Sequence, residues 1–304
     1  MKEIYSLVKR NVLVFIRDYT AVFFSILSML IVLGLMVVFL GSMNSNSVVN
    51  VLAQYGGERD TVTDEANAKY LIQMWTLAGI LVVNSVTVTL TVLTGMVSDE
   101  SRGRLASFYV APVKRLKITL GYVLAAWIIG TVMCMLTLLI GEIYMVIQGH
   151  ALLPFIDLAK LFGMICLNTF VYASLGYLLS LFIHSESGWS GMLTIIGTLV
   201  GFLGAIYLPM SQLPESVGNV LKCLPVLHGA SMMRQVLTAS AIEQTFRGLP
   251  KQVPEIFSEM MGISLKSGNQ EISFLYQVAF LFAYGIISLS LAALISKKRK
   301  VNDR

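Results

Sequence analysis

The chain has 304 residues, a formal net charge of +5 at pH 7 and only three cysteines. Hydrophobic residues make up 56% of it, charged residues make up 13%, and the mean hydropathy is +0.76. So few charges cannot cover a water-facing surface, which argues against a disordered chain, a secreted disulfide scaffold, a nucleic-acid-binding domain and a cytosolic enzyme. The composition predicts an all-α membrane protein.

The first predicted element is a helix within residues 1–19 that lies along the membrane surface. On a helical wheel, Lys2, Lys9, Arg10 and Arg17 fall on one side, and apolar residues such as Leu7 occupy the rest. Such a helix is typical of the cytoplasmic interface, with its basic face among lipid phosphates. A simple anchor for the first membrane span is an equally good interpretation.

Residues 20–304 form one predicted transmembrane domain with six apolar stretches, each of about 20 residues or more, the length that crosses a bilayer. The predicted spans are Ala21–Leu40, Leu71–Val97, Leu120–Ile147, Leu161–Ile183, Trp189–Leu208 and Ile272–Ile295. An even number of spans puts both termini on one side. That side carries four Lys and Arg residues in the N-terminal segment, five after the second span and five in the tail, so we expect it to be cytoplasmic.

The second predicted span carries a polar stripe formed by Asn84, Thr87, Thr91, Thr94 and Ser98. At 100° per residue these side chains share an arc of about 80°. Polar side chains rarely face lipid, so the stripe is expected to line a substrate path. The alternative is that the threonines bond to carbonyls of their own helix. Uncharged hydroxyls would suit an amphipathic or lipid-like substrate.

The cytoplasmic segment 98–119 comes next. Asp99 and Glu100 are expected near the start of a short helix, where the helix dipole favours acids. Leu105, Phe108 and Tyr109 should be exposed on that helix. Exposed aromatic side chains are typical of a docking surface for another protein. The alternative is that they lie back on the bilayer.

Two later spans contain notable residues. Glu142, the one acid well inside a span, is expected to snorkel to the surface, with pairing to Lys160 or a place at the exit of the path as alternatives. Gly197 and Gly201 form a GxxxG pair in the fifth span. Small residues at this spacing allow two helices to approach closely, either between subunits or within one chain.

Residues 209–271 follow the fifth span. Pro209, Pro214 and Pro225 divide stretches too short to cross a membrane, which predicts short re-entrant helices. The more polar part, Ala239–Ser273, is expected to form a small extracellular region.

The histidines give no sign of a metal site. His150, His184 and His228 are scattered and have no zinc-binding spacing. His184, Ser185 and Glu186 are adjacent in a short loop, where they cannot form a catalytic triad.

Two motifs on this layout resemble those of the permease subunits of ABC-2 type exporters. In the cytoplasmic segment the matching residues are Glu100, Gly103, Leu105, Phe108, Pro112, Lys114, Arg115 and Gly121. After the fifth span they are Gly204, Pro209, Pro214, Pro225 and Arg234.

The resemblance implies a half-transporter that pairs with a second permease, the same or a related chain. It also implies that a cytoplasmic ABC ATPase docks on the helix within 98–110. The coupling residues would be Glu100, Gly103, Arg104, Phe108 and Tyr109. It places Gly197 and Gly201 near the subunit interface.

No G-x-x-x-x-G-K-[ST] run occurs in the chain. We therefore expect a transport subunit without enzymatic activity or a bound cofactor, while ATP and Mg²⁺ bind to the partner ATPase. The leading hypothesis is an export permease of the bacterial cytoplasmic membrane that moves a drug-like, antibiotic or lipid-linked molecule outward. The alternative is an ATP-independent assembly or immunity protein that binds its ligand through the extracellular region.

Overall fold

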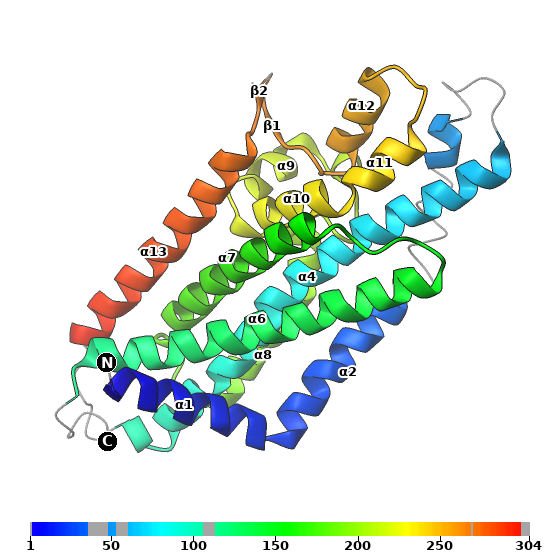
Figure 1. The fold of residues 1–304 in the computed structure, drawn as a ribbon. Coiled ribbons are helices and arrows are strands. Elements are labelled where there is room, and N and C mark those ends of the chain that lie inside the picture. The colour runs from blue at the N-terminus through cyan, green and yellow to red at the C-terminus, as the bar shows by residue number, and fades with distance from the viewer. Residues whose placement is uncertain (1, 36–47, 53–59, 106–112, 269, 299–304) are drawn as a thin grey trace.

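The computed structural model describes residues 2–35, 48–52, 60–105, 113–268 and 270–298, and within these ranges the chain is a bundle of helices (Figure 1). The four longest helices are α4 Thr61–Ser101, α6 Arg115–Ile147, α7 Phe155–Ser180 and α13 Phe274–Lys298. Each of the four is long and apolar enough to cross a membrane. The chain is therefore a multi-pass membrane protein.

Within the described residues, the first and fifth predicted spans do not correspond to single helices that qualify as membrane spans. Helix α1 (Lys2–Arg17) and the Tyr19–Ile31 part of α2 (Tyr19–Leu35) meet at a bend of 72°, and the bent pair qualifies as a fifth span if it is counted as one. Helix α8 (Glu186–Leu203) holds most of the predicted fifth span but is not among the helices that qualify. The count of six spans stays a prediction.

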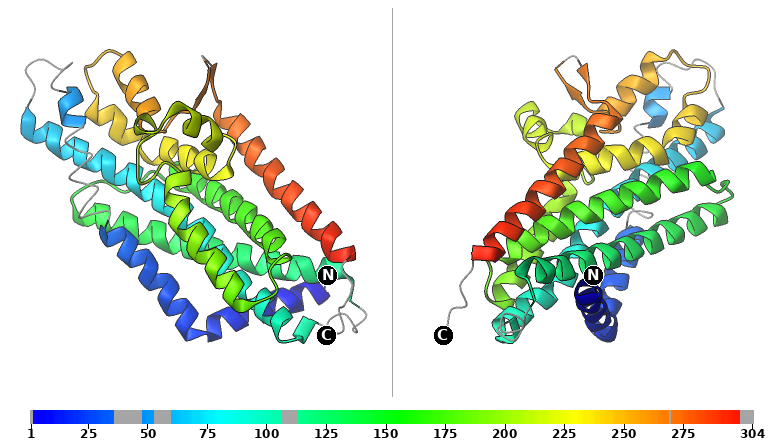
Figure 2. Two further views of the ribbon diagram at one scale, coloured as in Figure 1. Left: turned by 180° about the vertical axis from the view of Figure 1, so that it is seen from behind. Right: turned by 60° about the vertical axis from the view of Figure 1, so that its left-hand side comes forward.

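Helix α4 runs through the middle of the bundle, with α6 and α7 on one side and α8 on the other (Figures 1 and 2). Every residue from Tyr70 to Val86 is buried, as expected of a helix that is apolar all round. At about 1.5 Å per residue, its 41 residues extend about 61 Å, roughly twice the thickness of the hydrocarbon core.

Short elements cover the end of the bundle away from α1. They are the 3₁₀ helix η2 Met210–Gln212, α9 Glu215–Leu221, α10 Pro225–Leu237, α11 Ala239–Thr245, α12 Gln252–Met260, and the antiparallel pair β1 Lys266–Ser267 and β2 Gln270–Glu271. Pro209, Pro214 and Pro225 each stand at the start of a helix, where a proline is tolerated because its missing N–H would have no partner there. The predicted short helices are present, and their depth relative to the bilayer stays a prediction.

Arg234 of α10 links the segments that follow α8 and α12 in this outer region. Its buried guanidinium donates to the carbonyl oxygens of Gly204 (3.2 Å) and Ala205 (2.8 Å), just after α8, and to those of Met261 (3.4 Å) and Gly262 (3.3 Å), just after α12. It also lies over the ring of Trp75, 4.3 Å from the centroid. Two members of the second motif, Gly204 and Arg234, are thus in direct contact.

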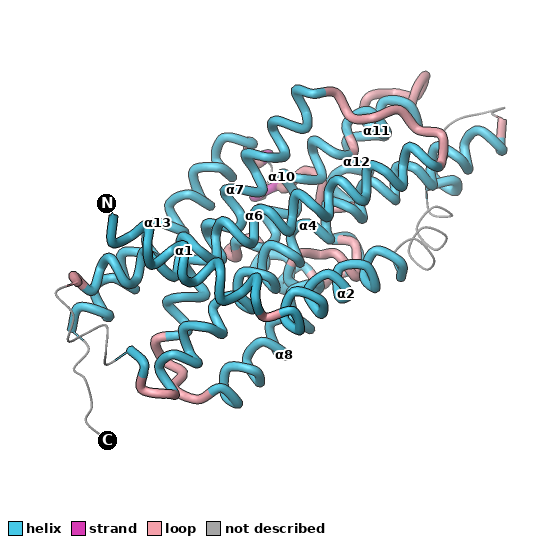
Figure 3. Tube along the Cα trace, turned by 60° about the horizontal axis from the view of Figure 1, so that its bottom comes forward, coloured by secondary structure: helices cyan, strands magenta, loops and turns pink. Residues whose placement is uncertain are grey.

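At the opposite end, α1 packs along α6 (Figure 3). A Cβ added at Gly121 would lie 2.7 Å from Cβ of Leu7, so only glycine permits this approach. The Asn11 side chain donates to the carbonyl oxygen of Gly121 at 3.1 Å. The apolar side of the helix therefore contacts protein.

The expectation for Arg10 is wrong, because this residue of the basic side pairs with Asp99 of α4 at 2.6 Å instead of facing lipid. Contact of Lys2, Lys9 and Arg17 with lipid stays a prediction.

The expectation for Glu142 is wrong. Its carboxylate is buried and accepts a hydrogen bond from the backbone N–H of Leu153 at 3.2 Å, while Lys160 pairs with Asp157 at 2.7 Å. The reason is that the segment between α6 and α7 folds back over the helix end and supplies a donor, so the side chain has no need to reach the surface.

Candidate functional site

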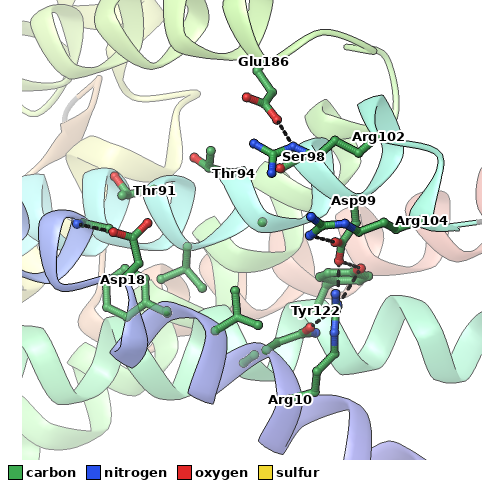
Figure 4. Close-up of a pocket in the computed structure, with 17 residues that line it drawn as sticks. Arg10, Asp18, Thr91, Thr94, Ser98, Asp99, Arg102, Arg104, Tyr122 and Glu186 are labelled. Atoms are coloured by element: carbon green, nitrogen blue, oxygen red, sulfur yellow. Dashed lines mark hydrogen bonds and ion pairs between the residues drawn. The ribbon is translucent and has the colours of Figure 1, made fainter.

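A pocket of about 410 Å³ lies inside the bend between α1 and α2, against α4, α6 and the start of α8 (Figure 4). Three arginines and three acids line it, together with four side chains that carry a hydroxyl group and several apolar ones. The lining residues are Arg10, Asn11, Val14, Phe15, Asp18, Ala21, Thr91, Val92, Thr94, Gly95, Ser98, Asp99, Arg102, Arg104, Tyr122, Ala125 and Glu186.

A charged network around Asp99 closes one end of this pocket. The Asp99 carboxylate pairs with Arg10 of α1 at 2.6 Å and with Arg104 at 3.5 Å. The Tyr122 hydroxyl of α6 donates to it at 2.7 Å. Because the Asp99 side chain is only 5% exposed, a lost partner would leave a poorly solvated charge. The network therefore fixes α1 against α4 and α6.

A second set of contacts ties the end of α4 to the start of α8. Glu186 pairs with Arg102 at 3.2 Å and accepts from Ser101 at 3.3 Å. The Ser98 hydroxyl, and then the charge of Arg102, lower the pKa of the Glu186 carboxyl, so it is ionised at neutral pH. The Nδ1 atom of His184 lies 2.8 Å from Oε1 of Glu100. The short loop that contains His184, Ser185 and Glu186 thus holds the C-terminal end of α4.

The position of Asp99 and Glu100 differs from the expectation. Both lie in the last turn of α4 rather than at the start of a new helix, because α4 continues beyond its apolar stretch. The helix ends at Ser101, and Gly103, two residues later, has a φ of +70°, the left-handed conformation common just after a helix C-terminus. Leu105, expected to be exposed, is buried. Phe108, Tyr109 and Pro112 lie outside the described residues.

The polar stripe of α4 divides into two parts. Thr91, Thr94 and Ser98 line the pocket, and the Thr94 hydroxyl accepts a hydrogen bond from the Trp189 indole at 3.0 Å. Asn84 does not line it and donates to Thr137 of α6 at 3.0 Å. The Thr87 hydroxyl bonds to the carbonyl oxygen of Val83 at 3.0 Å, as does Thr91 to that of Thr87 at 2.8 Å. The stripe as a substrate path stays a prediction, and the pocket includes the half of the stripe that lies nearer the C-terminal end of α4.

The two glycines of the predicted subunit interface have different surroundings. A Cβ at Gly201 would collide with the ring of Tyr207 in the same chain, whereas a Cβ at Gly197 would have no atom within 4 Å. Close packing within the chain explains Gly201. A subunit contact at Gly197 stays a prediction.

Several polar pocket residues were not predicted as site residues, among them Arg10, Asp18, Arg102, Tyr122 and Glu186. One signal could have identified Asp18, because it is an acid directly after a basic helix and accepts a hydrogen bond from the backbone N–H of Ala21 in the first turn of α2 at 3.0 Å. The pairing of Arg10 with Asp99 and Tyr122 has no local signal, because it joins three helices.

The arrangement suits the binding of an amphipathic molecule better than a reaction. Apolar side chains provide a surface for the apolar part of such a molecule, and charged side chains surround that surface. Within the described part of the chain, no group of three or more His, Cys, Asp or Glu residues could hold a metal ion.

The comparisons with known proteins agree with this architecture. Residues 58–294 match the family model of the ABC-2 family transporter protein. A search of curated proteins found no significant match. The match covers more than half of the chain and includes α4, α6, α7, α8, α10 and most of α13. The chain therefore belongs to the ABC-2 transporter family.

Proposed function

We propose that this permease is the membrane subunit of an ATP-driven exporter in the bacterial cytoplasmic membrane. It would cross the bilayer six times with both termini in the cytoplasm, and it would move a drug-like, antibiotic or lipid-linked amphipathic molecule outward. The observation that carries the proposal is the 410 Å³ pocket, which combines apolar and charged walls at the end of the bundle that holds α1. An amphipathic molecule needs both kinds of wall.

A separate ABC ATPase would bind ATP and Mg²⁺ and dock near the end of α4. The side chain of Glu100 is 18% exposed and is engaged by His184, whereas that of Arg104 is 54% exposed. Arg104 is therefore the better candidate for direct contact, and Gly103 sets the direction in which the chain leaves α4. Both stand directly before the segment that contains Phe108 and Tyr109.

A second permease subunit, the same or a related chain, would complete the transporter. The face of α8 that includes Gly191, Thr194, Ile195, Thr198 and Leu199 is exposed, and Gly197 adds open space beside it. These features support a subunit contact along α8.

The test is to isolate the permease with its ATPase and then to reverse one charge. Arg104→Glu should abolish association with the ATPase, because a side chain of the wrong charge near the centre of a protein–protein contact repels the partner. Lys160→Glu is the matched control: its side chain is 53% exposed and it also pairs with an aspartate, but it lies on α7, away from the end of α4.

The outcomes separate the two hypotheses. An ATPase that co-purifies with the wild type and the Lys160 variant but not with the Arg104 variant supports the exporter. If no ATPase associates with the wild type and a ligand binds to residues 209–271, the protein is the ATP-independent assembly or immunity protein instead.

A further inference from the structure

Among the residues that the structure describes, the charged residues of the pocket are not all in ion pairs. Asp99 is shared by Arg10 (2.6 Å) and Arg104 (3.5 Å), and Glu186 pairs with Arg102 (3.2 Å). These five residues account for every arginine of the lining and for two of its three acids. The third acid, Asp18, forms no ion pair within the described part of the chain.

Asp18 lies at the bend between α1 and α2 and is exposed. Its Oδ1 accepts from the backbone N–H of Ala21 at 3.0 Å, which caps α2 but leaves the negative charge in place. The adjacent Arg17 does not line this pocket; it lines a separate hollow on α1 with Ser6, Lys9 and Leu13. In the view of Figure 4, Asp18 and Thr91 lie toward one end of the pocket, and Arg10, Asp99 and Tyr122 toward the other.

The surface next to Asp18 is apolar. Val14, Phe15 and Ala21 come from the two helices of the bend, and Val92 and Ala125 face them from α4 and α6. A carboxylate that has no ion-pair partner, beside such a surface, favours a ligand with a cationic group and an apolar body.

We propose that this pocket binds a cationic amphiphile, with its positive group at Asp18 and its apolar part along Val14, Val92 and Ala125. The inference rests on the proposed transport function and names the substrate class of the same site. It also fits the expected position of the bend at the cytoplasmic membrane surface, because anionic lipids concentrate cationic amphiphiles in that leaflet.

The test uses Asp18→Asn, which removes the charge and keeps the cap, since asparagine and aspartate cap helices about equally well. The matched control is Asp60→Asn. Asp60 caps α4 at the far end of the bundle, where it accepts from the N–H of Val62 at 3.3 Å, and it does not line the pocket.

Binding is measured in lipid nanodiscs with rhodamine 6G, a lipophilic cation, and with Nile red, an uncharged dye. Quenching of tryptophan emission reports it, because Trp189 contacts the pocket residue Thr94, and empty nanodiscs give the background. Asp18→Asn should raise the Kd for rhodamine 6G about fivefold, the effect of losing one partly exposed ion pair, and should leave the Kd for Nile red unchanged. Asp60→Asn should change neither.

Unchanged rhodamine binding in Asp18→Asn, or an equal loss for both dyes, overturns the assignment of Asp18 while the pocket remains a binding site. Failure of the wild type to bind either dye above background overturns the substrate pocket itself, and with it the observation behind the proposed function. Asp18→Ser, which also caps a helix, must give the same result as Asp18→Asn. A difference between them attributes the effect to the cap and overturns the charge assignment.

Discussion

Arg234 is a positive charge in the interior of the protein without an acidic partner among the residues that bond to it. Its acceptors are backbone carbonyls directly after α8 and α12. The C-terminal end of a helix carries partial negative charge and unpaired carbonyl groups, so two helix ends together can stabilise one guanidinium. The face of Trp75 adds a cation–π contact. The guanidinium of Arg234 therefore offsets the partial negative charge at the C-terminal ends of two helices.

Replacing Arg234 by glutamine should lower the free energy of unfolding by about 3 kcal/mol, because several buried carbonyls lose their donor and each such loss costs roughly 1–3 kcal/mol. Thermal unfolding in detergent micelles measures the change. Lys251→Gln, which introduces the same residue at an exposed position of the same region, should stay within about 0.5 kcal/mol of the wild type. Equal stability of the two variants would show that Arg234 contributes nothing through its carbonyl contacts.

At the scale of the elements, α1 is held by its fit to α6 as well as by charge. Gly121 lets Leu7 approach the helix backbone, and the Arg10–Asp99 pair fixes the same helix from α4. The close approach explains why a glycine stands where the third predicted span begins. It also makes the docking of α1 sensitive to a single methyl group.

Gly121→Ala should destabilise the protein by about 1–3 kcal/mol, because the new methyl group overlaps Leu7 and overpacking costs this much. Gly163→Ala is the control: this glycine lies in α7 with no atom within 4 Å of an added Cβ. There, alanine should be neutral or stabilise by up to about 1 kcal/mol. Thermal unfolding compares the two, and a harmless Gly121→Ala would mean that α1 can shift without cost.

Some of these elements could be foreseen from local patterns and others could not. Four predicted spans coincide with α4, α6, α7 and α13 to within three residues at the ends that they overrun, because an apolar stretch of bilayer length is a strong local signal. The end of α4 was misplaced because Asp99 and Glu100 suit a helix start by the dipole rule. Their partners Arg10 and His184 are distant in sequence, and these contacts stabilise the acids at the end of a helix instead.

The candidate site shows the same limit. The hydroxyls of Thr91, Thr94 and Ser98 could be placed on one face of a helix by angle alone, and they do line the pocket. Asn84 shares that face, but it bonds to Thr137 because α6 passes it at that height. Packing decides which part of a polar stripe contacts a neighbouring helix and which part lines a cavity. A single sequence does not contain that information.

For the whole molecule, the proposed second subunit would contact the exposed face of α8. If Gly197 lies in that contact, Gly197→Leu should lower the dimer fraction, because a bulky side chain prevents the approach of another helix. Gly201→Leu cannot test this, since the new side chain would strike Tyr207 in its own chain. Gly163→Leu, on an exposed part of α7, is the control. Light scattering of purified variants measures the fraction, and an unchanged Gly197 variant would place the contact elsewhere.

The length of α4 gives it the properties of a lever. No proline interrupts its 41 residues, and its surroundings restrain it along most of that length. A tilt of 5° about the midpoint of a rod of about 61 Å displaces its two ends by about 2.7 Å in opposite directions. A displacement of Asp99 and Glu100 at one end would thus also move the other end, where Thr245 of α11 donates to the carbonyl oxygen of Asn67 at 3.3 Å. A force applied to α4 at one surface of the membrane would therefore displace the other end of the same helix, and no second helix would be needed to transmit it.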